Sequence, residues 1–229
     1  YRFSLDDDIW FLRDIAEQRP QSVFENPYMA LWKRLHDTYG TKINCNIYFQ
    51  CDGFDLTMMP DRYKGEWRDN ADWFRLTFHA LQNDPKEPYL EADYAQVAHD
   101  FDLVTEQILR FAGEECLNRF TTIHWGEATR DGCRAVRDRG IKGLCGYFRL
   151  DADGTPKVSY YADRELTEYL AERDYWKDID EDLIFIRHDI VINGVPLEDI
   201  RPHLDAVAAN PHQRDVMELM IHEQYFYPR

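Results

Sequence analysis

The sequence lacks every feature that would place it in or across a membrane. Its 229 residues contain no apolar run of about 18 residues, the length that spans a bilayer as a helix. It also has no secretory hydrophobic segment and no Asn-x-Ser/Thr glycosylation site. We therefore expect no membrane partner, although the chain begins at Tyr1 rather than Met, which leaves open a preceding segment.

Positive charge is scarce. The chain has 27 Lys and Arg against 43 Asp and Glu, which gives a net charge of −16. Binding to nucleic acid requires clustered Lys and Arg, so this balance predicts no nucleic-acid partner. A neutral or cationic ligand is compatible with it, and an acidic surface that serves only solubility is the simpler explanation.

Two kinds of motif are also missing. The five cysteines form no Cys-x-x-Cys pair, and an odd number of scattered thiols indicates reduced, mostly buried residues and a cytoplasmic location. Neither GxGxxG nor GxxxxGK[ST] follows any candidate strand, which argues against a nucleotide site.

What the sequence does contain is an alternation of short β-rich runs and amphipathic segments. The longest helical segment, 94–115, places apolar residues three and four positions apart along one face. Strands are expected at 1–5, 43–49, 73–80, 121–125, 143–148, 183–192 and 217–226. Helices are expected at 9–18, 27–39, 94–115, 127–139 and 196–209, and a hairpin with an Asp-Gly turn at 150–161. This pattern predicts one α/β domain over residues 1–229, an irregular seven-stranded (β/α) barrel, with an open doubly wound sheet as the alternative.

Polar residues gather at the C-terminal ends of these runs. Asp6, Asp7 and Asp8 end the first run, His79 the third, His124 the fourth, and His222 with Glu223 the last. In parallel α/β folds these ends meet on one face, where ligands bind. A single His after a strand is usually structural, but the repetition of the pattern predicts a shared site.

The residue types suit a divalent metal. Carboxylate and imidazole together favour Zn²⁺, Fe²⁺, Co²⁺ or Mn²⁺, and a second carboxylate beside a ligand can take a proton from the attacking water. Neighbouring strand residues point to opposite faces, but the end of a strand curls, so Asp6 and Asp7 can both serve one site. A bound cation would also offset the repulsion within the Asp run.

These residues resemble the motifs of the polysaccharide deacetylase family, metal-dependent amidases and esterases on a distorted (β/α) barrel. The family's first motif, [ST]-[FL]-D-[DE]-G, is similar to "SLDDD" at 4–8, and its second, H-[ST]-x-x-H, to "HALQN" at 79–83. The third, R-x-P-[YF]-G, aligns loosely with "TIHWG" at 122–126, and the last, L-x-H, with "LMIH" at 219–222. The resemblance spans nearly the whole chain in order and approximate spacing.

The resemblance implies a role for each matched residue. Asp6 would be the general base, Asp7 and His79 metal ligands, and His222 the general acid. Asn83 stands where the family has a second metal-binding His, so the third ligand is Asn83, Asp84 or His124. Thr122 stands where the family has an Arg that orients the base, and Asp8 replaces a Gly.

The sequence therefore predicts a metal-dependent hydrolase, with zinc as the expected metal, that removes an acetyl or other acyl group from an amino sugar or related amide. The expected partner is a carbohydrate or a small acylated molecule. Substrate contacts are expected from Asp8, Trp125, Glu223 and Tyr225. The alternative is a carbohydrate-binding or assembly protein that keeps the barrel without the chemistry. His188 with Asp189 forms a secondary candidate pair after a β run.

Overall fold

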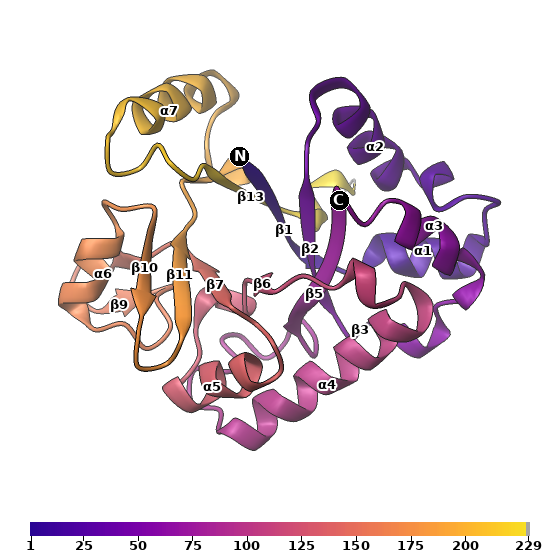
Figure 1. Ribbon diagram of the computed structural model, residues 1–229, viewed down its shortest axis with the longest axis horizontal. Helices are drawn as coiled ribbons and strands as arrows, with labels where there is room; N and C mark the ends of the chain where they lie inside the picture. Colours follow the sequence, from indigo (N-terminus) through magenta and orange to yellow (C-terminus); the bar gives the residue numbers. More distant parts are fainter. Residues whose placement is uncertain (228–229) are drawn as a thin grey trace.

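The computed structural model describes residues 1–227 and has a mixed α/β architecture. Its strands form two main sheets, with the helices outside them (Figure 1). The first sheet is parallel throughout, in the order β12–β13–β1–β2–β5. Its strands are β1 (Arg2–Asp8), β2 (Ile43–Tyr48), β5 (Phe74–Ala80), β12 (Ile190–Val191) and β13 (Glu218–His222).

The second sheet has the order β10–β11–β7–β6. Its strands are β6 (Phe120–Thr121), β7 (Gly143–Gly146), β10 (Tyr175–Asp178) and β11 (Leu183–Arg187), of which β10 alone runs antiparallel to its neighbour. Two hairpins complete the β structure, β3 (Gln50–Cys51) with β4 (Phe54–Asp55) and β8 (Arg149–Leu150) with β9 (Pro156–Lys157). The second is the hairpin expected over 150–161.

Two junctions connect the main sheets. Between β5 and β6 there is one isolated parallel bridge, Leu76 to Leu117, with a hydrogen bond from Asn118 N to Leu76 O of 3.0 Å. On the other side the chain passes directly from β11 to β12, and the N–H groups of His188 and Asp189 bond to Gly146 O and Glu218 O. The expected closed barrel is therefore not confirmed, because the strands form two sheets rather than one continuous ladder. The prediction of one domain over residues 1–229 stays a prediction.

The helices begin and end at residues that the sequence marks. They are α1 (Trp10–Gln18), α2 (Pro27–Tyr39), α3 (Lys64–Asp69), α4 (Tyr94–Phe111), α5 (Arg130–Asp138), α6 (Arg164–Leu170) and α7 (Leu197–Ala209). Asn26 caps α2 by accepting hydrogen bonds from Tyr28 N and Met29 N, and Gly40 ends it at φ +68°. The apolar face of α4 is buried as its spacing predicts, but the helix ends four residues earlier than expected, before Gly113 at φ +103°.

Some elements were missed or were shorter than expected. Helices α3 and α6 and strand β10 are short and were not predicted. The run 121–125 is strand only at Phe120–Thr121 and then turns into a 3-10 helix, His124–Gly126. The run 217–226 is strand only at Glu218–His222, followed by the 3-10 helix Glu223–Phe226. In both cases the chain leaves the sheet where the candidate site begins.

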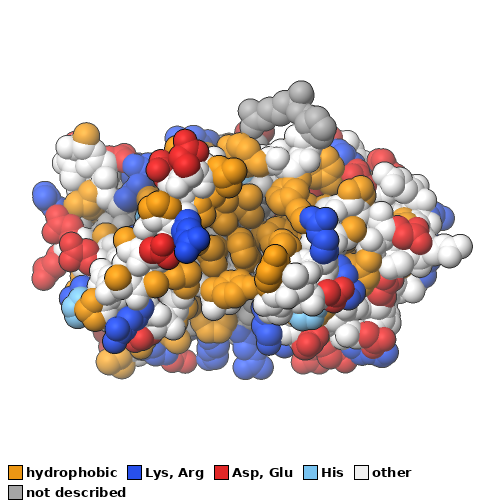
Figure 2. Space-filling view, turned by 90° about the horizontal axis from the view of Figure 1, so that it is seen from above, with side chains coloured by type: hydrophobic (Ala, Val, Ile, Leu, Met, Phe, Trp, Pro, Cys, Tyr) orange, Lys and Arg blue, Asp and Glu red, His pale blue; other side chains and the backbone are white. Residues whose placement is uncertain are grey.

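The core lies between the sheets and the surrounding helices, and helix α7 stands apart from it (Figure 1). Of the residues in α7 only Val207 is buried. Seen from above, apolar side chains gather in the middle of the face between α7 and α2 (Figure 2). Within residues 1–227, no helix combines the length and apolar character needed to cross a membrane.

Candidate metal centre

The end of β1 contains an extra residue that turns two neighbouring carboxylates toward the same space. Leu5 pairs with Cys45 and Asp8 with Ile47, so Asp6 and Asp7 together oppose the single residue Asn46. This is a β-bulge, and Asp7 adopts the left-handed conformation, φ +63°. The bulge is the physical reason why Asp6 and Asp7 both line one cavity instead of facing opposite sides of the sheet.

The two histidines also lie at backbone irregularities. Tyr48 of β2 pairs with Ala80 while Ile47 pairs with Phe78, so His79 is the extra residue of a second bulge. His124 begins the short helix after β6 and precedes Trp125, whose φ is +64°. Irregular backbone of this kind carries a conformational cost and is concentrated at functional sites.

Asp7, His79 and His124 bring three potential ligand atoms together, and we call them the ligand cluster. Oδ1 of Asp7 lies 3.1 Å from Nε2 of His79 and 3.3 Å from Nδ1 of His124, and these two nitrogens are 3.1 Å apart. The three side chains form the one such group of His, Cys, Asp and Glu found in residues 1–227. Of the three alternatives for the third ligand, His124 is the one that lies in this group.

Backbone carbonyls fix the orientation of both imidazoles. Nδ1–H of His79 donates to the carbonyl of Thr122 at 2.5 Å, and Nε2–H of His124 donates to the carbonyl of Asn83 at 3.2 Å. Because a carbonyl only accepts, the neutral form of each ring directs its lone pair at the centre of the cluster. In metal sites generally, a hydrogen bond from the other ring nitrogen orients the histidine in this way.

In the ligand cluster, burial and neighbouring charges shift the pKa of all three side chains. Burial alone would raise the pKa of Asp7, but the neighbouring His124 and His79 hold that pKa far below its ordinary value. Burial lowers the pKa of His79, and the Asp7 and Asp6 carboxylates outweigh it, so the net shift is upward. Burial and the neighbouring His79 lower the pKa of His124. The ligand cluster thus pairs a carboxylate whose pKa is lowered with two imidazoles whose pKa values shift in opposite directions.

Tyr48 is a member of the site that the sequence analysis missed. Its hydroxyl donates a short hydrogen bond to Oδ1 of Asp7 and lies 3.1 Å from Nδ1 of His124. Burial and Asp7 raise the pKa of the Tyr48 phenol, so it remains a donor. Tyr48 stands at the end of β2, the position shared by the other site residues, and this position was the available signal.

Most predicted catalytic residues face a cavity of about 360 Å³ beside the ligand cluster. Its lining includes Asp6, Asp7, His79, Asn83, Thr122, His124, Trp125, His188 and His222. Asp6 and His222 are Cα partners on adjacent strands. Nδ1–H of His222 donates a hydrogen bond to Oδ1 of Asn193, 2.9 Å away. Nε2 is therefore the nitrogen left for a ligand.

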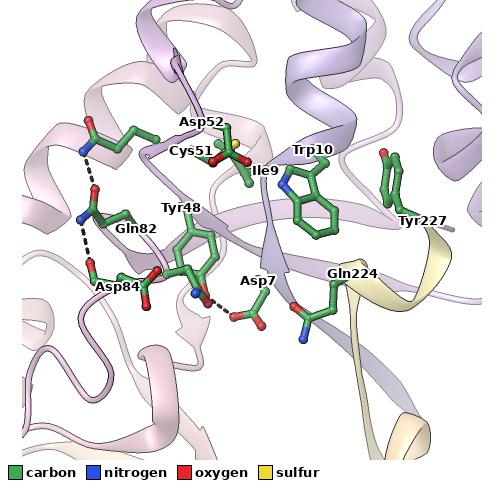
Figure 3. A pocket seen from close by; sticks show the side chains of 12 residues that line it. Asp7, Ile9, Trp10, Tyr48, Cys51, Asp52, Gln82, Asp84, Gln224 and Tyr227 are labelled. Carbon is green, nitrogen blue, oxygen red and sulfur yellow. Dashed lines mark hydrogen bonds between the residues drawn. The ribbon is translucent and has the colours of Figure 1, made fainter. Parts of the chain in front are cut away.

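A second cavity of about 490 Å³ lies on the other side of Asp7 (Figure 3). The rings of Trp10 and Tyr227 stand together on one wall, 5.2 Å between centroids. The amide of Gln82 lies on the opposite wall and donates to the backbone carbonyl of Asp84. Among residues 1–227, the lining contains Gln50, Gln82, Asn83 and Gln224 and no Lys, Arg or His. Asp7 therefore separates two cavities, one of them lined by amides, carboxylates and aromatic rings.

Three expected substrate contacts lie outside both cavities. Asp8 is fully buried and accepts a hydrogen bond from the hydroxyl of Tyr28, 2.8 Å away. Glu223 is fully buried and accepts from three backbone N–H groups at the start of α1, Ile9, Trp10 and Phe11. We assign neither residue a substrate contact, because Asp8 bonds to Tyr28 of α2 and Glu223 holds the start of α1. Tyr225 is 53% exposed, with its ring 6.3 Å from that of His222, and does not line either cavity.

Asn83 and Asp84, the other candidate ligands, lie at the edge of the cluster. Asn83 acts through its backbone carbonyl, which orients His124, and its side-chain oxygen lies 3.4 Å from the Tyr48 hydroxyl. Asp84 lines the second cavity. Trp125 is 43% exposed at the rim of the first cavity, with Nζ of Lys86 4.8 Å from its ring centroid.

Comparison with known proteins supports the fold. No protein-family model and no curated protein sequence matches the chain. Among solved structures, it is similar to a crystal structure described as a "putative polysaccharide deacetylase" from Mycobacterium smegmatis, with a TM-score of 0.51 and 13% sequence identity. The match covers 96% of this chain and 75% of that chain. The likeness is one of fold.

The residues present fit a divalent cation. One carboxylate oxygen and two imidazole nitrogens converge, and the tautomer of each ring is fixed by a carbonyl. This donor set is typical of three-ligand sites for zinc and related metals, which keep positions open for water or substrate. The arrangement is therefore consistent with a divalent metal centre.

Proposed function

We propose that this protein is a metal-dependent hydrolase of the polysaccharide deacetylase type, which removes an acyl group, such as acetyl, from an amino sugar or a related amide. The observation that carries the proposal is the placement of the ligand cluster beside Asp6 and His222 around one cavity. The fold likeness to a protein described as a deacetylase supports the same class of reaction.

Asp7, His79 and His124 would hold the metal. We propose zinc, and cobalt, manganese or iron suit the same donors. When bound, the cation supplies a Lewis acid that polarises the acyl carbonyl. The remaining steps belong to side chains of this chain.

Asp6 is the proposed general base. It is 2% exposed and lines the cavity beside the ligand cluster, where it can take a proton from the attacking water. His222 is the proposed general acid. Asn193 engages its Nδ1, so the proton that passes to the leaving amine is carried on Nε2. The two side chains come from adjacent strand ends and face the same cavity.

The substrate we propose is a carbohydrate that occupies the cavities on either side of Asp7. Trp125 at the rim of one cavity, and Trp10 with Tyr227 in the other, offer flat apolar faces, while the amides offer hydrogen bonds to hydroxyl groups. We also infer that the two main sheets are the halves of one irregular (β/α) barrel, joined at the β5–β6 and β11–β12 junctions.

The test is acetate release from a panel of N-acetylated and O-acetylated sugars, with Zn²⁺, Co²⁺ or Mn²⁺ added. The parent should turn over at least one of them. Asp6→Asn and His222→Ala should each lower turnover by about 100-fold or more and leave the metal content intact, because positioned proton transfer contributes about 10²–10⁴-fold. His99→Ala is the matched control, since His99 is exposed on α4 and remote from the cavity lining.

Two results would contradict the proposal. One is a parent that releases no acyl group from any sugar of the panel. The other is an Asp6→Asn or His222→Ala protein as active as the parent. Either would favour a carbohydrate-binding or assembly protein that keeps the fold, a reading that Thr122 in place of the family's Arg also favours.

A further inference from the structure

The carboxylate of Asp6 is held by two neutral donors on one oxygen. Nδ2 of Asn46 donates to Oδ1 at 2.6 Å, and the hydroxyl of Ser4 donates to the same atom at 3.1 Å. Both donors are fully buried. No hydrogen bond from residues 1–227 reaches Oδ2, and Asp6 lines the first cavity. One oxygen is therefore anchored in the interior, and the other is left for a ligand.

The amide of Asn46 has one orientation available. Its Oδ1 accepts from Nδ2 of Asn44 at 2.7 Å and from the backbone N–H of Thr122 at 3.4 Å, while the hydroxyl of Thr121 donates to the carbonyl of Phe78. Asn44 accepts in turn from Nδ2 of Asn118 at 2.6 Å. Because the oxygen end of Asn46 is occupied by donors, its N–H₂ end must face Asp6. Three asparagines thus form a ladder that runs from the start of β6 across β2 to the end of β1.

This ladder stands where the resembled family would place a charged residue. Thr122 takes the position of the Arg that orients the base, and its hydroxyl lies 3.4 Å from that of Ser4 and 3.5 Å from Nδ2 of Asn46. Thr122 is uncharged, so it cannot supply the positive charge that an arginine would place beside Asp6. Within the residues that the structure describes, the donors on Asp6 are an amide and a hydroxyl.

We propose that Asn46, held by Asn44 and the backbone N–H of Thr122, is the positioning residue that holds the Asp6 carboxylate with one oxygen in the cavity. The inference rests on the proposed function, in which Asp6 takes a proton from water. Loss of the anchor frees the carboxylate to rotate, and a misplacement of about 1 Å can cost about 100-fold in rate.

The first experiment compares Asn46→Ala with Asn26→Ala, both prepared with metal. Asn26 is also a buried asparagine, but its side chain caps α2 by bonding to Tyr28 N and Met29 N and makes no hydrogen bond to Asp6, so its loss should cost stability without removing the anchor of Asp6. We expect kcat of Asn46→Ala to fall about 100-fold with KM and metal content unchanged, and kcat of Asn26→Ala to stay within about twofold of the parent. An unchanged kcat for Asn46→Ala, or a change confined to KM, overturns the inference.

The second experiment does not depend on turnover. Crystal structures of the parent, Asn46→Ser and Ser4→Ala report the position of the Asp6 carboxylate directly, and Asn46→Ser leaves a smaller void should Asn46→Ala fail to fold. A rotated Asp6 carboxylate in Asn46→Ser, with metal still bound, supports the inference. An Asp6 carboxylate in its parental position there overturns it, whether or not the parent hydrolyses any sugar of the panel. An inactive parent by itself counts against the proposed function alone.

Discussion

Two buried polar clusters lie at opposite ends of β1 and show different degrees of order. At its C-terminal end, the ligand cluster directs three lone pairs at one point, and each imidazole is oriented by a carbonyl. At its N-terminal end, Arg2 and Glu218 form with His188 what we call the interior cluster; the ring of His188 also reaches the first cavity, where its Nε2 lies 3.4 Å from Oγ1 of Thr122. There Arg2 Nη1 lies 3.5 Å from Glu218 Oε2, and His188 Nδ1 lies 3.9 Å from Glu218 Oε1.

The interior cluster leaves many atoms without hydrogen bonds. Both oxygens of Glu218, Nδ1 of His188, and Nε and Nη2 of Arg2 have no partner within residues 1–227. Burial accordingly lowers the pKa of His188 to about 4 and raises the pKa of Glu218 to about 7. The contrast teaches that convergence and orientation of donors, rather than burial of charge, distinguish a binding site from a buried polar network.

The largest expected effect comes from removing one residue of the ligand cluster. Asp7→Ala should lose the bound metal and the activity together, because only two nitrogens would remain. Glu218→Gln, at the other end of β1, should keep its metal. Elemental analysis of proteins purified without chelator measures both. Metal that is substoichiometric in the parent and unchanged in Asp7→Ala would show that the ligand cluster holds no cation.

The next largest effect concerns stability and tests the interior cluster. The pKa of Glu218 rises from 4.5 to about 7 on folding, so the folded state holds its proton more tightly. The stability from this group is therefore present below about pH 4.5 and is lost as the pH rises to about 7. The corresponding loss in the free energy of unfolding is on the order of 3 kcal/mol.

Urea unfolding of the parent and Glu218→Gln at several pH values between about 4.5 and 7.5 measures this loss. The parent should lose stability relative to the glutamine variant, which has no proton to release at this position. Equal pH dependence in the two proteins would mean that folding does not raise the pKa of Glu218.

A smaller effect, on metal affinity, should follow from Tyr48→Phe. This variant tests whether the hydrogen bond that orients Asp7 contributes to metal binding. The change removes the hydroxyl that donates to Asp7 but leaves the three ligands and the ring. Contacts of this kind typically contribute about 10- to 100-fold in metal affinity. Competition with a chelator gives the metal Kd of both proteins, and an unchanged Kd would place Tyr48 outside the support of the site.

The positions of site residues were predictable because strand ends can be read from the sequence. Asp6, Asp7, His79, His124 and His222 all follow apolar runs, and the structure brings them to one cavity. The roles of Asp8 and Glu223 were not predictable from position alone. Glu223 directly follows His222, yet its side chain turns away to cap α1, a contact with residues more than 200 positions earlier in the chain.

The helices and strands also divide into those that the local sequence predicts and those that depend on distant contacts. Helix α2 carries its start signal, Asn26-Pro27, and its stop signal, Gly40, so its bounds were predicted correctly as 27–39. The bulges at Asp7 and His79 depend on pairing between distant strands and leave no mark in local periodicity. The division of the strands into two sheets is likewise set by which edges meet, a property of tertiary packing.

The ligand cluster lies at the junction between β5 and β6 and takes its residues from both main sheets. The sheets meet there through one backbone bridge and a few side-chain bonds, such as the one from His79 Nδ1 to Thr122 O. Asp7 and His79 belong to the first sheet, and His124 follows β6 of the second. A cation bound by all three side chains would link the two sheets, so we expect the metal-loaded protein to be more stable than the metal-free protein.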